Sequence, residues 1–294
     1  MQYYTSSFNT FDLDEEKFFA LFPKRPADAY KGSNGKILLI SGSYGMAGAA
    51  CLNVLGAKAL GAGYICVMLP ENIYPIVASQ NITPVFYPYE GQTNLEFMLD
   101  QLGKELSAAA FGSGAVRNPR KDNILKYLLS EDTEVPLVLD AEAINMLSER
   151  KFLLGKTPRP LIITPHLGEF CRFTGNASEA VNKDPVRAAA DCAAKYGTIT
   201  VLKGPRTVVA SPSGRVYINS SGNQGLAQAG SGDLLTGMIT AMLSFIEDPF
   251  EAACMGVFAH GLAADKLCEK HSFQCMPLEQ IPEAMDQLFK AHGF

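Results

Sequence analysis

The stretch Lys36-Ile37-Leu38-Leu39-Ile40-Ser41 decides the fold that we expect, together with the segments that follow it. A short run of leucine and isoleucine is typical of a buried strand. A loop over residues 42–48 follows, then an alanine-rich stretch over 49–62 that favours a helix, then a second apolar run over 64–69. Strand, helix and strand in this order form a βαβ unit, so the sequence predicts a parallel sheet covered by helices.

The same alternation continues through most of the chain. Further strands are predicted over residues 108–111, 136–140, 161–164 and 198–203. Near the end, Ser211-Pro212-Ser213-Gly214 is typical of a hairpin turn between strands at 207–210 and 215–218. Helices are then predicted over 233–245, 249–269 and 278–290. We therefore expect one three-layer α/β/α domain over residues 1–294 with a mainly parallel central sheet, and residues 1–34 as an irregular or helical N-terminal extension.

Composition argues against several classes of function. The 294 residues carry a net charge of −5 and no cluster of Lys and Arg, unlike a nucleic-acid-binding surface. The apolar region over 46–69 is interrupted by Asn53, Lys58 and glycines, so no membrane span is expected. The seven cysteines form no C-x-x-C pair, as is typical of reduced core thiols. Because residues 1–19 are polar and then acidic, unlike a secretory or transit peptide, we expect a cytoplasmic protein.

A glycine-rich turn with one carboxylate is the most informative chemical signal. The run Gly222-Asn223-Gln224-Gly225-Leu226-Ala227-Gln228-Ala229-Gly230-Ser231-Gly232-Asp233 leads straight into an apolar helical pattern. Backbone N–H groups of such a turn form a cradle for an anion, and glycine lets a phosphate approach without meeting a Cβ. A carboxylate at this point suits a base that takes a proton from a hydroxyl attacking the phosphate. Taken alone, an ordinary helix N-cap at Asp233 explains the motif equally well.

A second polar segment follows the predicted strand at 161–164, and ligands of open parallel sheets bind at such strand ends. In Thr164-Pro165-His166-Leu167-Gly168-Glu169, His166 is a candidate to bind a ligand, and Glu169 a candidate to position a hydrated Mg²⁺ near phosphates. A satisfied loop histidine and a first-turn helix glutamate are the structural alternatives. We favour function for His166 and find no site context for the other three histidines.

Two further strand ends carry charged residues. Lys203-Gly204-Pro205-Arg206-Thr207 offers two cations and a hydroxyl that suit nucleotide phosphates, although a solvated loop would look the same. For Asp140 we slightly favour a helix cap over a functional carboxylate. The loop at 42–48 lacks the G-x-G-x-x-G spacing, and Glu71 is a weak substitute for the acid of a dinucleotide-binding fold, which argues against a Rossmann dehydrogenase. Walker A and nucleophile-elbow motifs are absent from the sequence.

In their order, these motifs resemble the ribokinase-like superfamily, and more closely the ADP/ATP-dependent NAD(P)H-hydrate dehydratases that repair hydrated nicotinamide cofactors. The resemblance covers nearly the whole chain, from Lys31-Gly32-Ser33-Asn34-Gly35 to Gly230-Ser231-Gly232-Asp233. His166 stands where sugar and vitamin kinases usually carry Asn, which favours the dehydratases. Ala229 replaces a usual glycine and tolerates positive φ poorly, so we expect a slightly different turn there. From the length of 294 residues, we expect no counterpart here of the N-terminal epimerase domain of many bacterial relatives.

The resemblance implies a ribokinase-like fold and an ADP-dependent (S)-NAD(P)H-hydrate dehydratase, a hydro-lyase that uses ADP or ATP with Mg²⁺. It implies that Asp233 is the base and that backbone N–H groups of Gly230, Ser231 and Gly232 hold the developing negative charge. The implied nucleotide-binding residues are Lys203, Gly204, Pro205, Arg206, Thr207, Asn223, Gly225 and Gly232. The implied substrate-binding residues are Ala49, Gly114, His166 and Asp233. It further implies a homo-oligomer acting on a small molecule.

Two other functions stay open from the sequence. A ribokinase-like kinase for a small heterocycle would use the same Asp233 and release a stable phosphorylated product. A non-catalytic nucleotide sensor could share the fold, although a carboxylate beside phosphates would not help a protein that only binds.

Overall fold

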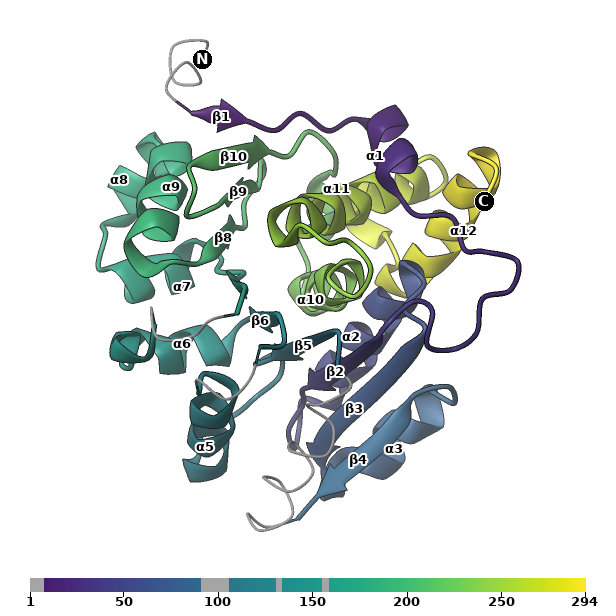
Figure 1. The fold of residues 1–294 in the computed structure, drawn as a ribbon, viewed down its shortest axis with the longest axis horizontal. Coiled ribbons are helices and arrows are strands. Elements are labelled where there is room, and N and C mark those ends of the chain that lie inside the picture. The colour runs from purple at the N-terminus through teal and green to yellow at the C-terminus, as the bar shows by residue number, and fades with distance from the viewer. Residues whose placement is uncertain (1–7, 91–105, 131–133, 155–158) are drawn as a thin grey trace.

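A computed structural model describes residues 8–90, 106–130, 134–154 and 159–294. Its described residues form a ten-stranded sheet in the order β1-β10-β9-β8-β7-β6-β5-β2-β3-β4, with helices on both faces (Figure 1). The strands are β1 (Asn9–Thr10), β2 (Lys36–Ile40), β3 (Tyr64–Pro70), β4 (Val85–Tyr89), β5 (Ala108–Phe111), β6 (Leu137–Leu139), β7 (Leu161–Ile163), β8 (Ile199–Leu202), β9 (Val208–Ala210) and β10 (Arg215–Ile218).

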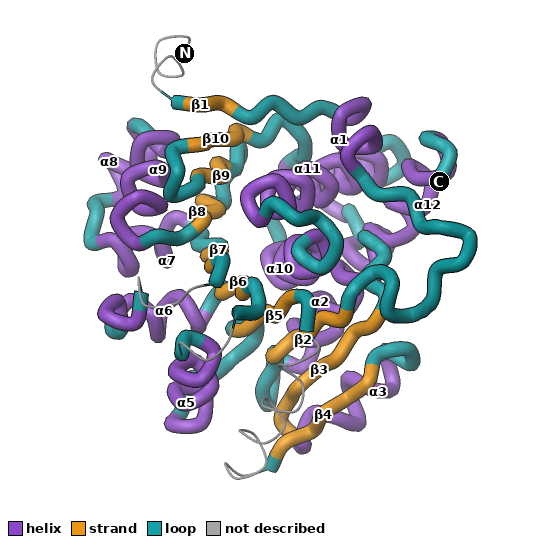
Figure 2. Tube along the Cα trace, in the orientation of Figure 1, coloured by secondary structure: helices purple, strands orange, loops and turns teal. Residues whose placement is uncertain are grey.

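Two groups of helices cover the two faces. One group holds α2 (Ala47–Ala59), α3 (Tyr74–Gln80), α10 (Ser231–Met242), α11 (Pro249–Cys268) and α12 (Ile281–Ala291), with the short α1 (Glu15–Leu21) beside them. The other holds α5 (Pro119–Leu128), α6 (Glu142–Ser148), α7 (Leu167–Thr174), α8 (Ser178–Lys183) and α9 (Pro185–Tyr196). The strands run between these groups in Figure 2.

The pairing confirms the mainly parallel sheet. From β4 through β3, β2, β5, β6 and β7 to β8, each strand is parallel to the next. In β2, for example, Ile37 pairs with Ile65 of β3 and with Ala108 of β5. The predicted hairpin is present, because β9 pairs antiparallel with both β8 and β10. Only these closely spaced strands can reverse direction through a short turn, whereas the parallel pairs need helical crossovers.

Alternation along each strand explains the three layers. Successive side chains of β2 point to opposite faces, so Ile37 and Leu39 enter one core while Leu38 and Ile40 enter the other. A strand buried on both faces reads as a continuous apolar run, which is why residues 36–41 carry no polar alternation. The three-layer prediction is confirmed.

The N-terminal segment contributes more than the predicted extension. α1 is helical as expected, but β1 adds a parallel edge strand to β10 through Asn9 opposite Arg215. Phe11 then packs its ring edge-on against Tyr217 and Phe250. A two-residue strand carries no sequence signal of its own, because its position is set by these tertiary contacts. Among the described residues, the helices include none with the length and apolar character needed to cross a membrane.

Helices α2 and α10 cross at very close range through two glycines. A Cβ on Gly56 would overlap the backbone carbonyl of Leu234, and a Cβ on Gly237 would overlap that of Asn53. Only residues without a side chain allow this approach. The crossing matters for the site because Asp233 lies in the first turn of α10.

Gly237→Ala should therefore destabilise the protein by about 3 kcal/mol, because the added methyl forces α2 and α10 apart. Gly48→Ala is the matched control, since Gly48 also lies in a helix but has nothing within 4 Å of an added Cβ. It should leave stability unchanged or raise it by about 0.5–1 kcal/mol. Urea unfolding of both variants measures the difference. Equal stabilities would contradict the close-crossing argument.

Candidate functional site

The strand order reverses direction between β2 and β5, and polar loops gather at that edge. β2 leads to β3 and β4 on one side, whereas β5 and the later strands continue on the other. The two loops that follow are tied together, because Gly42 N donates to Ser113 O (2.9 Å) and Ser43 Oγ donates to Gly114 O (2.7 Å). Such a reversal opens a crevice at the carboxyl ends of the strands, where ligands bind in open α/β sheets.

A buried polar cluster lies at the ends of β5 to β8. The carboxylate of Asp140 accepts hydrogen bonds from Thr164 Oγ1 (2.7 Å), Lys203 Nζ (2.9 Å) and Ser113 Oγ (3.1 Å). Burial alone would raise the pKa of Asp140, but the Lys203 ammonium and these hydrogen bonds outweigh it and hold the pKa below its ordinary value. Asp140 is therefore an anion at neutral pH.

Our interpretation of Asp140 as a helix cap is wrong. The residue at the N-cap of α6 is Ala141, which offers no side-chain hydrogen bond, and the Asp140 carboxylate points to Ser113, Thr164 and Lys203 instead. Local sequence could not show this, because all three partners are far from Asp140 along the chain.

The backbone after Asp140 is strained. Ala141 has φ 49° and ψ −119°, and it is the one non-glycine residue with positive φ in the described part of the chain. L-residues rarely adopt this region, and such strain persists only where the surroundings enforce it. The neighbouring Gly112 has φ 125°, and a Cβ there would overlap the Asp140 carbonyl. These unusual backbone conformations therefore lie just after the carboxyl ends of β5 and β6, next to the polar cluster.

Asp233 lies in the first turn of α10. The N-cap is Gly230 with φ 93°, so Asp233 is the third helical residue and the alternative of an N-cap at Asp233 does not apply. Its backbone carbonyl accepts a 2.6 Å hydrogen bond from Asn53 Nδ2 in α2. Burial and the nearby Asp140 charge raise the pKa of Asp233 to about 6, against the opposing pull of Lys203. This carboxylate is ionised at neutral pH, yet it is a stronger base than an exposed one.

The turn ahead of α10 is held in place by α11 and by its own side chains. Asp265 accepts from Gly222 N (2.7 Å) and from Asn223 Nδ2 (2.8 Å). Gln228 Nε2 donates to Gly225 O (2.7 Å) and Met276 O (2.9 Å). The positive φ in this turn falls on Gly230 and not on Ala229, so the alanine carries no backbone strain of that kind.

A cleft of about 930 Å³ runs along this turn. The predicted residues that line it are His166, Lys203, Gly204, Pro205, Thr207, Asn223, Gly230, Ser231, Gly232 and Asp233. Five predicted residues do not line it: Ala49, Gly114, Glu169, Arg206 and Gly225. Lys203 Nζ lies 3.2 Å from where a Cβ on Gly232 would be. Because glycine has no side chain, this cation can lie against the first turn of α10.

Ala49 and Gly114 lie together beside that cleft. Gly114 has φ 61°, and its hypothetical Cβ would meet Met46 O at 3.0 Å and Gly42 Cα at 3.3 Å. Gly114 belongs to the loop after β5, and Ala49 lies in the first turn of α2, just after the loop that follows β2. The Ala49 Cβ lies 2.5 Å from where a Gly114 Cβ would be. The two predicted substrate contacts are thus brought together by the structure, as one wall at the strand-order reversal.

His166 and Glu169 form a capping box at the start of α7. His166 Nδ1 accepts from Gly168 N (3.0 Å), and Glu169 Oε2 accepts from His166 N (2.9 Å). Glu169 is buried, whereas the His166 side chain is 55 % exposed and lines the cleft. Both ring nitrogens of His166 are therefore engaged, because Nε2 also lies 3.3 Å from Glu169 Oε1, while the exposed ring still lines the cleft. The described residues include no cluster of three or more His, Cys, Asp or Glu able to hold a metal, so a role for Glu169 near Mg²⁺ stays a prediction.

Sequence reasoning missed His260, Asn53 and Asp265. His260 Nε2 lies 3.4 Å from Ser231 Oγ and lines the cleft, so our finding that it lacked site context is wrong. Burial, with the Lys203 charge, lowers the pKa of His260 to about 4, so the ring is neutral. A histidine within the apolar, small-residue sequence of α11 was the available signal. Asn53 is likewise a polar residue within the apolar, small-residue sequence of α2.

The arrangement is suited to phosphoryl transfer. The first turn of α10, which no side chain caps, meets the Lys203 cation at Gly232, and Asp233 is the next residue. Helix N-termini and lysine stabilise phosphate charge, and a raised-pKa carboxylate accepts a proton. Asp140 does not share that role because its carboxylate is fully engaged.

Asp140→Asn should lower the pKa of Asp233 below 6, because it removes a nearby negative charge and leaves the Lys203 cation unpaired. Carbon-13 carboxyl shifts of labelled aspartate, followed from pH 4 to pH 8, measure this without any substrate. Asp286→Asn, at an exposed position on α12, is the control and should leave the titration unchanged. An unshifted Asp233 titration in Asp140→Asn would contradict the electrostatic coupling.

Comparison with known proteins accords with this site. A family model described as NAD(P)H-hydrate dehydratase matches residues 37–287. The chain is 34% identical over 276 residues to the ADP-dependent (S)-NAD(P)H-hydrate dehydratase of Bacillus subtilis, covering 94% of this chain and 96% of that protein. A crystal structure of the ADP/ATP-dependent NAD(P)H-hydrate dehydratase from Bacillus subtilis, co-crystallised with ATP and Mg²⁺, superposes with a TM-score of 0.87 at 32% identity, covering 98% of this chain and 100% of that one.

Longer relatives match as well. The bifunctional NAD(P)H-hydrate repair enzyme of Moorella thermoacetica is 35% identical over 261 residues, which cover 86% of this chain and 49% of that protein. The chain thus spans about half the length of that bifunctional relative. The fold is ribokinase-like, as expected. On the extent of these matches, this chain belongs to the NAD(P)H-hydrate dehydratase family.

Proposed function

We propose that this chain dehydrates the S-form of hydrated NADH or NADPH, and couples that reaction to hydrolysis of ADP or ATP. The observation that carries the proposal is Asp233, a carboxylate with its pKa raised to about 6, in the first turn of α10, whose N-terminus no side chain caps. Family membership supports the choice of reaction, and the cleft at α10 supplies the space for a nucleotide.

The nucleotide lies in the cleft along the turn before α10. Lys203, Gly204, Pro205 and Thr207 form one wall, and Asn223 and Gly232 the other. The terminal phosphate faces the N–H groups of Gly230, Ser231 and Gly232, which attract it at no cost in rearrangement. Arg206 is exposed and reaches the phosphates only by bending back, while Gly225 acts by shaping the turn. Mg²⁺ would be held mainly by the nucleotide phosphates and would offset their negative charge, and Glu169 would contribute through water.

The hydrated ring lies between Asp233, His166, Ala49 and Gly114. Asp233 takes the proton of the 6-hydroxyl as that oxygen attacks the terminal phosphorus, and the bond from phosphorus to the bridging oxygen of the nucleotide breaks. The C6–O bond of the phosphate ester then breaks, driven by the lone pair of the ring nitrogen, and a ring proton is lost. The products are NADH or NADPH, inorganic phosphate, and AMP or ADP.

Recovery of reduced-nicotinamide absorbance from hydrated NADH, with Mg²⁺ and either ADP or ATP, tests the proposal. Asp233→Asn should lower the turnover number by about 10²–10⁴-fold, because the base is removed, while nucleotide affinity stays close to wild type. Asp286→Asn should be fully active, since that carboxylate is exposed and far from the cleft in sequence and fold.

Three outcomes count against the proposal. No recovery of absorbance with either nucleotide contradicts the dehydration. A stable phosphorylated product instead identifies a small-molecule kinase working through the same Asp233. Full activity of Asp233→Asn contradicts its role as base.

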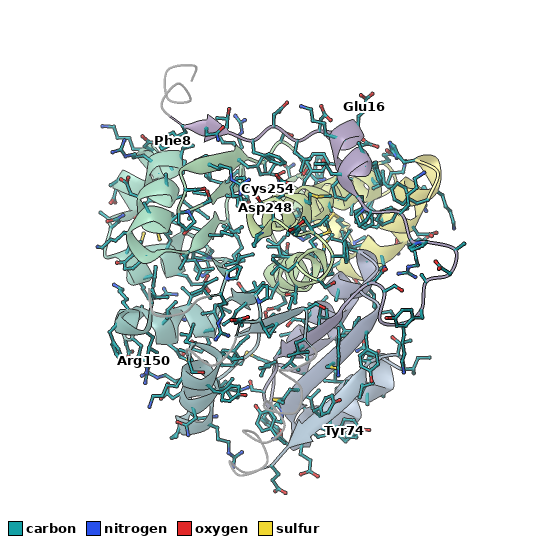
Figure 3. All side chains as sticks on the ribbon, in the orientation of Figure 1. Phe8, Glu16, Tyr74, Arg150, Asp248 and Cys254 are labelled. Atoms are coloured by element: carbon teal, nitrogen blue, oxygen red, sulfur yellow. The ribbon has the colours of Figure 1, made fainter. Side chains whose placement is uncertain are left out.

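We further propose a cytoplasmic homo-oligomer. All seven cysteines are free thiols, which suits a reducing compartment. Apolar side chains are exposed on α3 and beside the edge strand β4, among them Tyr74 (labelled in Figure 3), Ile76 and Ile82, the last of them 91 % exposed. Clustered exposed apolar side chains mark interaction surfaces.

Sedimentation equilibrium should give a mass that is a multiple of the single chain. Ile76→Glu combined with Ile82→Glu should reduce it, because charges would then be buried in the interface. A wild-type protein that sediments as a single chain contradicts the assembly.

A further inference from the structure

A second cleft, of about 740 Å³, adjoins the predicted substrate wall. It is lined by the loop after β2, the ends of β3 and β4, and the start of α5. Ser43 connects the two regions, because it lines this cleft while its Oγ donates to Gly114 O. The cleft therefore continues from the Ala49 and Gly114 side of the site and not from the nucleotide side.

Lys121 in this cleft is a buried cation without a hydrogen-bond acceptor. The residue is 2 % exposed, and its Nζ has no hydrogen-bond partner in the described part of the structure. The rings of Tyr89 and Phe111 lie with their centroids 5.5 and 5.8 Å from Nζ. Aromatic faces stabilise the charge in part, but they leave the three N–H donors without an oxygen. Burial accordingly lowers the pKa of Lys121 to about 8.

Tyr89 also lines this cleft, and its hydroxyl is a second buried polar group without a hydrogen-bond partner among the described residues. Two unpartnered polar groups on one wall are unfavourable unless a polar ligand meets them. Lys121 is an ammonium, so the ligand that suits it is an anion. Arg120, the residue directly before Lys121 in α5, adds an exposed cation to the lining of the cleft.

Two carboxylates, Glu71 and Glu90, also line the cleft. Neither forms an ion pair with Lys121 within the described residues. A surface with cations on one part and carboxylates on another fits a ligand that carries both phosphates and hydroxyls. Glu71 follows β3 directly and lines the cleft, and a carboxylate is an acceptor for the hydroxyl groups of a ribose.

We propose that Lys121 and Arg120 bind a phosphate group of the dinucleotide substrate in this second cleft, with Glu71 accepting hydrogen bonds from a ribose. The inference rests on the proposed function. The hydrated nicotinamide must reach Asp233, so the diphosphate and adenosine parts of the molecule extend past Ala49 and Gly114. The second cleft is the space that adjoins those residues.

Calorimetric titration with NAD⁺ and NADP⁺, which are stable and cannot be dehydrated, tests the proposal. Saturating ADP is present throughout so that the first cleft is filled. Lys121→Met keeps an unbranched side chain between the rings but removes the charge, and should weaken dinucleotide binding about ten- to hundredfold. Lys126→Met, at an exposed position of α5, should bind as wild type does. ADP affinity alone should be the same in all three proteins.

Comparing the two dinucleotides shows which phosphate Lys121 contacts, the diphosphate that both contain or the 2′-phosphate of NADP⁺. An equal loss for NAD⁺ and NADP⁺ places Lys121 on the diphosphate, and a loss for NADP⁺ alone places it on the 2′-phosphate. Unchanged affinity for both in Lys121→Met overturns the proposal. Lys121→Arg should retain most of the affinity because it keeps the charge, and a loss equal to that of Lys121→Met also overturns it.

Thermal unfolding distinguishes this role from a structural one. Removing a buried, unpaired ammonium should leave the melting temperature of Lys121→Met unchanged or higher. A lower melting temperature with unchanged dinucleotide affinity assigns Lys121 to structure and overturns the proposal. Dinucleotide binding that depends on Lys121 without dehydration of the hydrate would refute the proposed reaction and not this subsite. Dehydration by Lys121→Met at an unchanged KM would refute the subsite and not the reaction.

Discussion

The buried ion pair between Asp140 and Lys203 is the contact on which the site depends. It joins the ends of β6 and β8 across β7, which adds the hydroxyl of Thr164 to the same carboxylate. A buried carboxylate is tolerable only with such partners, and removing one partner of a buried pair is far costlier than the pair is stabilising. The pair holds the lysine ammonium against Gly232, and its two charges act in opposite directions on the pKa of Asp233. One contact thus sets both the position of the cation and the basicity of the carboxylate.

The close crossing of α2 and α10 supplies the second constraint. Gly56 and Gly237 let the helices approach until Asn53 holds the Asp233 carbonyl, which ties the start of α10 to the helix that follows the substrate loop. α11 contributes from the far side through Asp265 and His260. The turn before α10, where we propose that the phosphate binds, leads into α10 and is also held by contacts with α2 and α11. This rigidity is what a preorganised phosphate site requires.

The strand-order reversal at β2 and β5 gives the site two sides. The proposed nucleotide side lies along the turn before α10, and the proposed substrate side begins at the tied loops after β2 and β5. His166 stands at the first of these while also closing the capping box of α7. The second cleft extends the substrate side toward α5, where a lysine is buried without an acceptor. A dinucleotide substrate needs such an extension, and a small kinase substrate does not.

Sequence by itself determined the three-layer parallel fold, and most of the site residues that it predicted line the cleft. Hydrophobic runs of strand length, alternating with helical stretches, admit few other folds, and strand ends of a parallel sheet necessarily share an edge. The glycines of the turn before α10 were also readable, because positive φ and close approach require that residue. The short strand β1, the role of Asp140 and the place of His260 were not readable. Their partners lie 24 to 63 residues away for Asp140 and 29 for His260, and only the tertiary structure brings such groups within hydrogen-bonding distance. The same holds for Lys121, which local sequence shows as one more charge at the start of a helix. Burial, which decides whether a charge needs a partner, is a property of the folded chain alone.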